Sequence, residues 1–422
     1  MEATRIRLAE GVHLTYLPAR KFKTSLLSAQ FVTPLRRETA GANALLAAVL
    51  RRGTVSCPDM GALSAKMDNL YDASIDYTVR KKGENQCVGF VASFIDDRYA
   101  PGGERLLEPA AALLGELICD PVTYHGRFVP EYFESEKTNL LEAIRSLIND
   151  KRDWADSRLL RALCDGEAYA VPRLGDEETV DKLQALKVYT QYRDLISTAP
   201  LEIIYSGSAD LERVKQALAA AFATLPREEV RVISTAEPHV CRESVQHVED
   251  VLDVTQGKLG MGFSCGSDDM PALLMGNTLF GGSSNSKLFL NVREKLSLCY
   301  YASSLYHRQK GLITVSSGIE FQNYQRAYDE IMAQLEAVQK GELEDWELEG
   351  ARSTLLNSYA TVGDSQGKLE NFYLGQAATG QHETPADLAR AIQDMTAERI
   401  CRAMSTVKLD TVYFLKGKEA EA

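Results

Sequence analysis

Histidine and cysteine are the residue types in this sequence that could hold a transition metal. No two histidines lie three or four positions apart, as two ligands on one face of a helix would. No cysteine pair has Cys-x-x-Cys spacing, and several cysteines lie in apolar runs, which indicates reduced, buried thiols. The sequence therefore predicts no metal ion in this chain and structural roles for these side chains. The histidines are His13, His125, His239, His247, His307 and His382.

Other short catalytic motifs are also missing from the sequence. There is no Gly-x-Ser-x-Gly elbow, no P-loop and no dinucleotide-binding fingerprint. Gly281-Gly282 could begin a phosphate loop, but Lys287 does not follow at the Walker spacing. The basic clusters Arg51-Arg52 and Arg80-Lys81-Lys82 are typical of solvated faces.

The composition is that of an ordinary globular protein. The 422 residues are 45% apolar and 25% charged, and the formal net charge is −12. This acidic balance argues against nucleic acid or an anionic membrane surface as a main partner. The N-terminus has no apolar signal region, and no apolar run reaches the roughly 20 residues that span a bilayer. We therefore expect a cytoplasmic protein.

Apolar periodicity predicts two halves of the chain with the same order of elements. Hairpin strands alternate with blocks of helices, which predicts an α+β fold and not a doubly wound parallel sheet. In the first half, strands are predicted at 11–17, 25–33, 73–79, 85–94 and 201–207, and helices at 42–50, 58–70, 103–119 and 129–149, with a further helix capped by Ser208 or Asp210. In the second half, strands are predicted at 254–263, 298–306, 311–319 and 411–417, and helices at 271–279, 323–340 and 345–359. We predict domains at 1–225 and 241–422 that are joined by a polar, proline-flanked linker at 226–240.

The helix around residues 40–54 resembles the zinc-binding helix of the M16 (pitrilysin/insulinase, mitochondrial processing peptidase) metallopeptidases. That family has the pattern Gly-x-x-His-x-x-Glu-His-x-x-x-x-Gly-Thr. Aligned on Gly53-Thr54, the two ligand histidines fall on Ala44 and Ala48, and the catalytic glutamate falls on Ala47. A methyl group can neither bind zinc nor accept a proton from water. The resemblance therefore implies a non-catalytic member of a peptidase family.

The third zinc ligand of the family is a glutamate on a later helix, in a pattern like Glu-(Arg/Lys)-x-x-Ile-x-x-Glu. Aligned on Glu136-Lys137, this ligand falls on Ala143. Glu142 lies one position away, but one residue turns a side chain by about 100° around a helix, so Glu142 would face away. The metal site is thus expected to be absent from this chain. Further matches to the family lie at 133–142 and 171–175.

The strongest resemblance is the block Gly281–Tyr300, which matches a Gly/Ser-rich loop followed by Ser-(Arg/Lys)-Leu-Phe and Val-Arg-Glu-Lys. In the family, an arginine and a tyrosine at the spacing of Arg293 and Tyr300 reach the substrate near the scissile carbonyl. A guanidinium and a phenol are rigid donors that can stabilise an oxyanion. A structural role for both side chains is the alternative. The same resemblance implies substrate contacts for the loop residues Gly281, Gly282 and Ser283, although a plain turn before a helix explains them equally well.

The M16 resemblance covers essentially the whole chain and implies two homologous α/β sandwich domains, each with a mainly antiparallel sheet faced by helices on one side. It implies a partner: a sister subunit with an intact His-x-x-Glu-His helix, which would supply zinc while this chain supplies substrate contacts, chamber walls and a strand edge for peptide binding. The alternative is an inactive scaffold or binding protein, for example a homodimer. The subtype that is most similar is a small bacterial M16 protein associated with elongation factor P modification, although no residue here argues for that chemistry.

Overall fold

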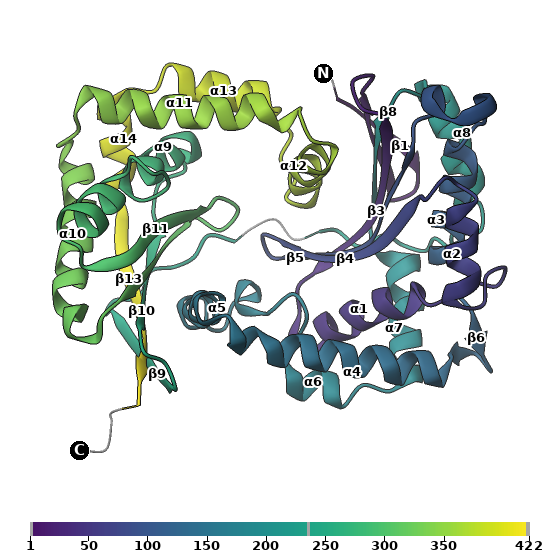
Figure 1. The fold of residues 1–422 in the computed structure, drawn as a ribbon, viewed down its shortest axis with the longest axis horizontal. Helices are drawn as coiled ribbons and strands as arrows, with labels where there is room; N and C mark the ends of the chain where they lie inside the picture. Colours follow the sequence, from purple (N-terminus) through teal and green to yellow (C-terminus); the bar gives the residue numbers. More distant parts are fainter. Residues whose placement is uncertain (1–2, 234–236, 419–422) are drawn as a thin grey trace. The chain divides into compact units, whose positions relative to one another are not determined.

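The computed structural model of the chain describes residues 3–233 and 237–418. The chain forms two compact units, and each unit is assembled from three segments (Figure 1). Unit 1 comprises Met1–Arg145, Val171–Thr235 and Gly363–His382, and unit 2 comprises Ser146–Ala170, Ala236–Val362 and Glu383–Ala422.

Unit 1 is built around a six-stranded sheet in which all neighbours are antiparallel except β2 and β8. In order across the sheet, the strands are β1 (Thr4–Ala9), β2 (Val12–Pro18), β8 (Leu201–Gly207), β3 (Thr24–Pro34), β5 (Asn85–Ile95) and β4 (Ser74–Lys82). A separate short hairpin joins β6 (Thr123–Tyr124) and β7 (Arg127–Phe128). The helices of this unit include α1 (Arg37–Leu50), α2 (Met60–Asp68), α3 (Leu107–Cys119), α4 (Pro130–Ser146), α6 (Glu177–Asp181), α7 (Ala185–Thr198), α8 (Leu211–Ala221) and α12 (Gln366–Ala378).

The two faces of the unit 1 sheet are covered by helices from different parts of the sequence. Along β3, Leu27, Ala29 and Phe31 belong to the hydrophobic core, and helices α1, α3 and α7 contact this sheet. Side chains alternate along a strand, so Ser28 points to the opposite face. There its Oγ donates to the carboxylate of Glu370 on α12 at 2.6 Å. Helix α12, from the second half of the sequence, therefore covers the second face.

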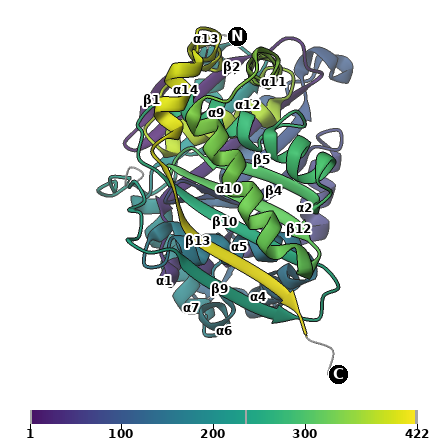
Figure 2. The ribbon, with the colours of Figure 1, turned by 90° about the vertical axis from the view of Figure 1, so that its left-hand side faces the viewer.

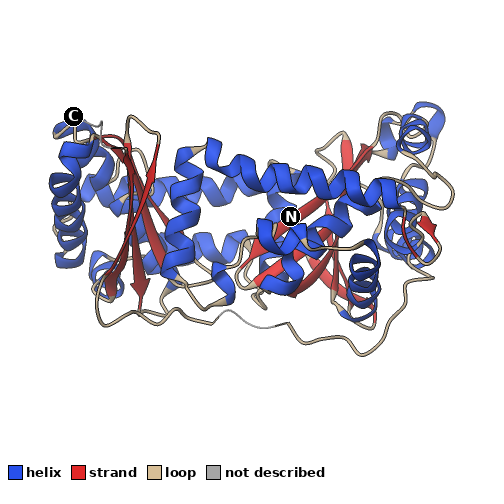
Figure 3. Cartoon of the chain, turned by 90° about the horizontal axis from the view of Figure 1, so that it is seen from below, coloured by secondary structure: helices blue, strands red, loops and turns tan. Residues whose placement is uncertain are grey.

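Unit 2 repeats this plan with a five-stranded sheet, in which only β13 and β9 pair in parallel. Its strands, in order, are β11 (Cys299–His307), β12 (Leu312–Ile319), β10 (Gly257–Cys265), β13 (Val407–Gly417) and β9 (Gln246–Leu252). Its helices include α5 (Lys151–Leu163), α9 (Met270–Phe280), α10 (Tyr324–Lys340), α11 (Asp345–Val362), α13 (Pro385–Gln393) and α14 (Ala397–Met404). Figure 2 looks at the face of the sheet that α10 covers, and Figure 3 shows helices on both faces.

Helix α5 lies on the second face of the unit 2 sheet because two glycines of β10 leave room for it. Leu259, Met261 and Phe263 point into the core on the other face. A Cβ at Gly260 would lie 3.2 Å from Cδ2 of Leu159, and a Cβ at Gly262 would lie 2.8 Å from Cδ2 of Leu163. The missing side chains let the helix pack closely against the strand.

The predicted α+β fold class is confirmed, since both units combine a mainly antiparallel sheet with packed helices. The expectation of helices on one side of each sheet is wrong, because α12 covers the second face of the unit 1 sheet and α5 covers the second face of the unit 2 sheet. Asp210, one of the two predicted caps, begins α8 by accepting the N–H of Arg213 at 3.0 Å. Periodicity did not predict the edge strands β1 and β9, in which every residue is exposed or half-exposed and none is buried. Among the described helices, none is both long and apolar enough to cross a lipid bilayer.

The compact units differ from the predicted consecutive domains 1–225 and 241–422. Segment 146–170 belongs to unit 2 and segment 363–382 belongs to unit 1, so each half of the sequence contributes one helix to the other unit. The boundary between units at 235 and 236 falls inside the predicted linker 226–240, of which residues 234–236 lie outside the described residues.

Gly89 in β5 is expected to be essential for the sheet that positions β4. We expect Gly89→Ala to destabilise unit 1 by about 3 kcal/mol, because a Cβ there would overlap the Ala29 carbonyl oxygen of β3. Since that oxygen is backbone, it cannot move without disturbing the β3–β5 pairing. Thermal unfolding followed by circular dichroism measures the effect. Gly367→Ala in α12 is the matched control and should be neutral or slightly stabilising, because its nearest neighbouring atom lies 3.8 Å away. A melting temperature unchanged by Gly89→Ala would contradict this packing.

Candidate functional site

The positions that the sequence aligns with zinc ligands meet at one cavity of unit 1. Ala44 and Ala48 of α1 and Ala143 of α4 all line this cavity, whose volume is about 740 Å³. Residues 44 and 48 are one helical turn apart, so their side chains share a face of α1. The tertiary structure thus brings the three positions together, but none carries a nitrogen, oxygen or sulfur side-chain atom.

Two neighbouring positions lie elsewhere. Ala47, aligned with the catalytic glutamate, is 1% exposed and belongs to the hydrophobic core of unit 1. Glu142 is exposed and is not among the residues that line the cavity. The residues at this site therefore cannot hold the zinc ion of the family in its usual manner.

One carboxylate does remain at the cavity. Glu136 of α4 is buried and forms an ion pair with Arg52, at 3.2 Å, and accepts a hydrogen bond from Nδ2 of Asn139, also at 3.2 Å. Burial, and secondarily the negative charge of Glu136, raise the pKa of Tyr77, which lines the same cavity. With its charge engaged by Arg52, Glu136 serves the structure of the cavity wall.

Strand β4 forms a second wall, with residues 77–82 all lining the cavity. Arg80 makes a bidentate pair with Glu370 of α12, both N···O distances being 2.6 Å. Lys82 donates to Oδ1 of Asn371 at 2.6 Å. The interpretation of Arg80-Lys81-Lys82 as a merely solvated face is therefore wrong, because Arg80 and Lys82 contact α12 and all three residues line the cavity.

Arg173 completes the basic wall from the loop after unit 2's first segment. Its Nη1 donates to the backbone carbonyl of Val79 in β4 at 3.1 Å, and its own carbonyl accepts from Nε2 of Gln86 at 2.5 Å. Sequence reasoning did not single out Arg173 as a site residue. The signal available for it was its place in the family-like segment 171–175.

Arg293 and Tyr300 both lie in unit 2, near the edge strand β11. Arg293 is on the π-helix η5 (Leu288–Lys295), and its side chain is 40% exposed, 3.5 Å from Glu294 and stacked on the ring of Phe289 at 4.7 Å. Tyr300 is 62% exposed and donates to Glu320 at 2.8 Å. Within the described residues, no hydrogen bond or ring contact joins Arg293 to Tyr300. Both side chains thus reach solvent, each with a local partner.

A buried ion pair holds the start of the η5 helix that carries Arg293. Lys287, at its start, is buried and pairs with both carboxylate oxygens of Glu347 on α11, at 3.0 and 3.1 Å. Glu347 also accepts the backbone N–H of Glu344 at 2.9 Å. π-Helices are rare and are frequently found at functional sites.

The Gly/Ser-rich loop has a local packing role. The N–H groups of Gly281 and Gly282 both donate to the carbonyl of Asn277, near the end of α9. A Cβ at Gly281 would lie 2.7 Å from the backbone nitrogen of Ser304, and Ser283 donates its Oγ to the carbonyl of Thr278 at 3.2 Å. A turn before a helix accounts for these contacts. A substrate role for Gly281, Gly282 and Ser283 stays a prediction.

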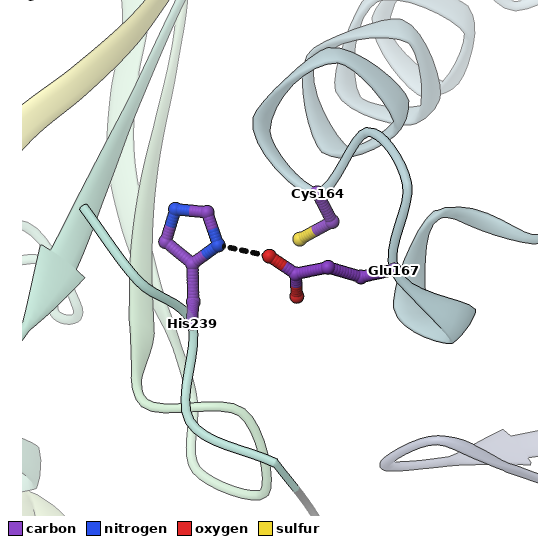
Figure 4. Close-up of side chains that lie close together, drawn as sticks. All are labelled: Cys164, Glu167 and His239. Carbon is purple, nitrogen blue, oxygen red and sulfur yellow. Dashed lines mark hydrogen bonds and ion pairs between the residues drawn. The ribbon is translucent and has the colours of Figure 1, made fainter. Parts of the chain in front are cut away.

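A second polar cluster in unit 2 joins three residues of metal-ligating types that are far apart in the sequence. Cys164, Glu167 and His239 place one ligand atom each within 4.8 Å of one another (Figure 4). Nδ1 of His239 lies 2.5 Å from Glu167, and its Nε2 lies 3.2 Å from Asp410. Because both ring nitrogens already contact carboxylates, the cluster is explained as a network that ties residue 239 to the end of α5.

Cations complete this network. Lys310 lies 2.6 Å from the second oxygen of Glu167, and Arg242 pairs with Asp410 at 2.5 Å. Burial alone would raise the pKa of Asp410, but hydrogen bonds from the backbone of Arg242 and from the side chains of Thr411, His239 and Arg242 outweigh it and lower that pKa. The position of His239 in the sequence did not indicate that its side chain would be buried in this network.

The comparisons with known proteins agree with the chemistry of the cavity. Residues 182–355 match the family described as Peptidase M16 inactive domain. The chain is 34% identical over 416 residues to the "Probable inactive metalloprotease YmfF" of Bacillus subtilis, covering 97% of this chain and 96% of that protein. It is 20% identical over 318 residues to the "Uncharacterized zinc protease YmxG" of the same organism, covering 74% of this chain and 76% of that protein. A conserved protein from Enterococcus faecalis V583 has a crystal structure with a TM-score of 0.90 and 26% identity, over 100% of both chains.

A relative of this similarity, matched along almost the whole chain, establishes the family. The alanines at 44, 47, 48 and 143 provide no ligand atom and no general base at the positions aligned with the family's zinc site. This chain therefore belongs to the M16 peptidase family, as one of its inactive members.

Proposed function

We propose that this chain is the non-catalytic subunit of a heterodimeric M16-type zinc peptidase. A sister subunit with an intact His-x-x-Glu-His helix supplies the zinc ion and the general base. This chain supplies substrate contacts and part of the chamber wall. The observation that carries the proposal is a selective loss: the metal-ligand positions are alanine, while the cavity around them and the exposed Arg293 and Tyr300 remain.

The edge of the unit 1 sheet supports peptide binding. Among the strands of residues 3–233 and 237–418, β4 pairs with β5 alone, so its other side is an edge to which a strand can be added. The carbonyl of Ile75 accepts from Arg51 at 2.5 Å and that of Val79 accepts from Arg173, so both point away from β5. Backbone N–H and C=O groups of every second residue point to the same side of an antiparallel strand, so those of Tyr77 also point away from β5. An extended peptide can pair with β4 at Tyr77, between the two carbonyls that Arg51 and Arg173 already occupy and beside the cavity.

Arg293 and Tyr300 are the proposed contributions of unit 2 to catalysis. Both are rigid hydrogen-bond donors that reach solvent, so a substrate in an assembled chamber can meet them in exchange for their local partners. The π-helix and the buried Lys287–Glu347 pair hold the backbone of Arg293 in place. A donor positioned in advance stabilises developing negative charge without reorganisation.

The partner is proposed from chemistry and from one observation on relatives. Bacillus subtilis has both a relative named as a probable inactive metalloprotease, YmfF, and one named as an uncharacterized zinc protease, YmxG, and both resemble this chain. The presence of both kinds of chain in one organism supports the proposed pairing. The first test is purification of this chain from its own host under native conditions, with partners identified by mass spectrometry. Recovery of an equimolar M16 protein with the zinc motif supports the proposal, and recovery of the chain alone contradicts it.

In the complex, Arg293→Ala is expected to lower kcat/KM for peptide hydrolysis about a hundredfold, as loss of one oxyanion donor does. Assembly should not change, because the exposed Arg293 side chain has only local partners in this chain. Peptide turnover and size-exclusion chromatography measure the two effects. Lys295→Ala, at an exposed position of the same helix, is the matched control and should keep full activity. Unchanged turnover by the Arg293→Ala complex would rule out this role.

A second candidate is an inactive scaffold or binding protein, for example a homodimer. It is favoured by the local partners of the two side chains, since Tyr300 bonds Glu320 and Arg293 stacks on Phe289. Under this alternative both residues stabilise the rim of unit 2 and act on no substrate. A role in elongation factor P modification stays a prediction from resemblance, since neither the relatives nor the site residues bear on it.

A further inference from the structure

The cavity of unit 1 has a local excess of positive charge. Arg80, Lys81, Lys82 and Arg173 line it, and Glu136 is the one carboxylate among its described lining residues. Glu136 is engaged by Arg52, which is not part of the lining. Since the whole chain has a net charge of −12, this basic wall contrasts with the remainder of the protein.

The cations of this wall differ in how their charge is balanced. Arg80 is compensated by the buried carboxylate of Glu370. Lys82 and Arg173 instead donate to neutral acceptors, the side chain of Asn371 and the carbonyl of Val79. A neutral acceptor satisfies one N–H but leaves the formal charge uncompensated. The guanidinium of Arg173 has further N–H groups and can still take a carboxylate in bidentate fashion.

The surroundings of these two cations favour an incoming anion. Arg173 is exposed, and Lys82 is half-buried at the end of β4. Burial lowers the pKa of Lys82, because water is partly removed from around its ammonium group. A carboxylate placed beside Lys82 would restore the lost stabilisation of its charge.

The geometry of β4 indicates which side chains of a bound peptide would lie near these cations. Side chains alternate along β4, so Arg80 and Lys82 point to the same side of the strand. A peptide strand paired with this edge also alternates, so every second side chain lies on the side of Lys82. Acidic residues with a spacing of two would therefore meet the basic wall together.

We infer that the peptide bound in the unit 1 cavity is acidic, with aspartate or glutamate at alternate positions facing Lys82 and Arg173. This inference rests on the proposed peptide-binding function and adds the class of peptide to it. The charges decide between otherwise similar peptides, while the backbone of β4 supplies affinity that does not depend on sequence.

Fluorescence anisotropy with the full chain tests the inference. Three labelled peptides share one extended sequence and carry glutamate, glutamine or lysine at every second position. The glutamate peptide is expected to bind at least about tenfold more tightly than its glutamine counterpart at about 50 mM salt, and the lysine peptide more weakly still. The preference should shrink at about 500 mM salt, where charges are screened.

Single substitutions test whether Lys82 and Arg173 cause the preference for the glutamate peptide. Arg173→Gln and Lys82→Gln, alone and combined, should reduce binding of the glutamate peptide toward the level of the glutamine peptide, and should change binding of the glutamine peptide much less. Lys187→Gln removes one exposed positive charge from α7, outside the cavity, and should change neither. Circular dichroism melting confirms that each variant is folded, and the exposed position of Arg173 makes its variant the safer one.

The outcomes separate the two proposals. Equal binding of the glutamate and glutamine peptides would overturn the acidic preference while peptide binding stands. A preference that survives loss of both cations would place the charge recognition elsewhere and overturn the assignment. Failure of all three peptides to bind would contradict the peptide-binding function itself.

Discussion

The triple variant Ala44→His/Ala48→His/Ala143→Glu is expected to bind one zinc ion, with a dissociation constant of about 1 μM or lower, whereas the unaltered chain binds none. The three positions line one cavity, and two histidines with one glutamate form the ligand set of many catalytic zinc sites. The nearby positive charge of Lys82 opposes a dication, which is why we expect micromolar and not nanomolar affinity. Ala47 stays unchanged because it lies in the core and is not a ligand position.

Isothermal titration calorimetry and elemental analysis after dialysis measure this binding. The double variant Ala44→His/Ala48→His is a matched control, because it retains the natural Glu142 one residue away from position 143. Glu142 is exposed and does not line the cavity, so the double variant should bind zinc far more weakly. If the double and triple variants bound zinc equally well, the alignment of the third ligand on Ala143 would be wrong.

Glu370→Ala is expected to destabilise unit 1 by about 3 kcal/mol and to lower its melting temperature by about 10 °C. Glu370 is 3% exposed, pairs with both terminal nitrogens of Arg80 and accepts the hydroxyl of Ser28. Its removal leaves a guanidinium in a partly buried place without its counter-charge. Breaking a buried pair on one side costs more than the intact pair contributes.

Thermal and urea unfolding measure this loss, and two variants interpret it. Glu212→Ala removes an exposed carboxylate that pairs with Lys215 on α8, and should cost less than about 1 kcal/mol. Arg80→Leu combined with Glu370→Leu removes both charges and should regain much of the stability lost in Glu370→Ala. A melting temperature that Glu370→Ala leaves unchanged would mean that α12 does not depend on this pair.

The sequence alone was sufficient for the features that depend on local pattern. The β-forming residues of β3, the alternation within β5 and the helical periodicity of α3 and α10 predicted these elements to within a few residues, because side chains repeat with a period of 2 in a strand and 3.6 in a helix. The alanines at 44, 47, 48 and 143 exclude the zinc chemistry of the family without reference to the fold, since side-chain type alone decides whether a ligand atom exists. The length and order of the elements likewise predicted two related α+β halves.

Only the tertiary structure showed which segments complete each unit. Helices α5 and α12 cover sheets from the other half of the chain, and the space for α5 depends on Gly260 and Gly262 lying opposite its leucines. No local pattern encodes such a contact, because packing joins residues that are far apart in the sequence.

The candidate site also depends on contacts between residues that are far apart in the sequence, so no local pattern predicted it. A basic run on an edge strand has the sequence pattern of a solvated face, and it becomes a cavity wall only when α4, the Arg173 loop and α12 lie around it. His239 looks isolated in the sequence, yet carboxylates 72 and 171 positions away contact its two ring nitrogens. The residue types determined what chemistry this protein lacks, and the folded structure decided which charges meet, because electrostatic and packing forces act on distance in space and not along the chain.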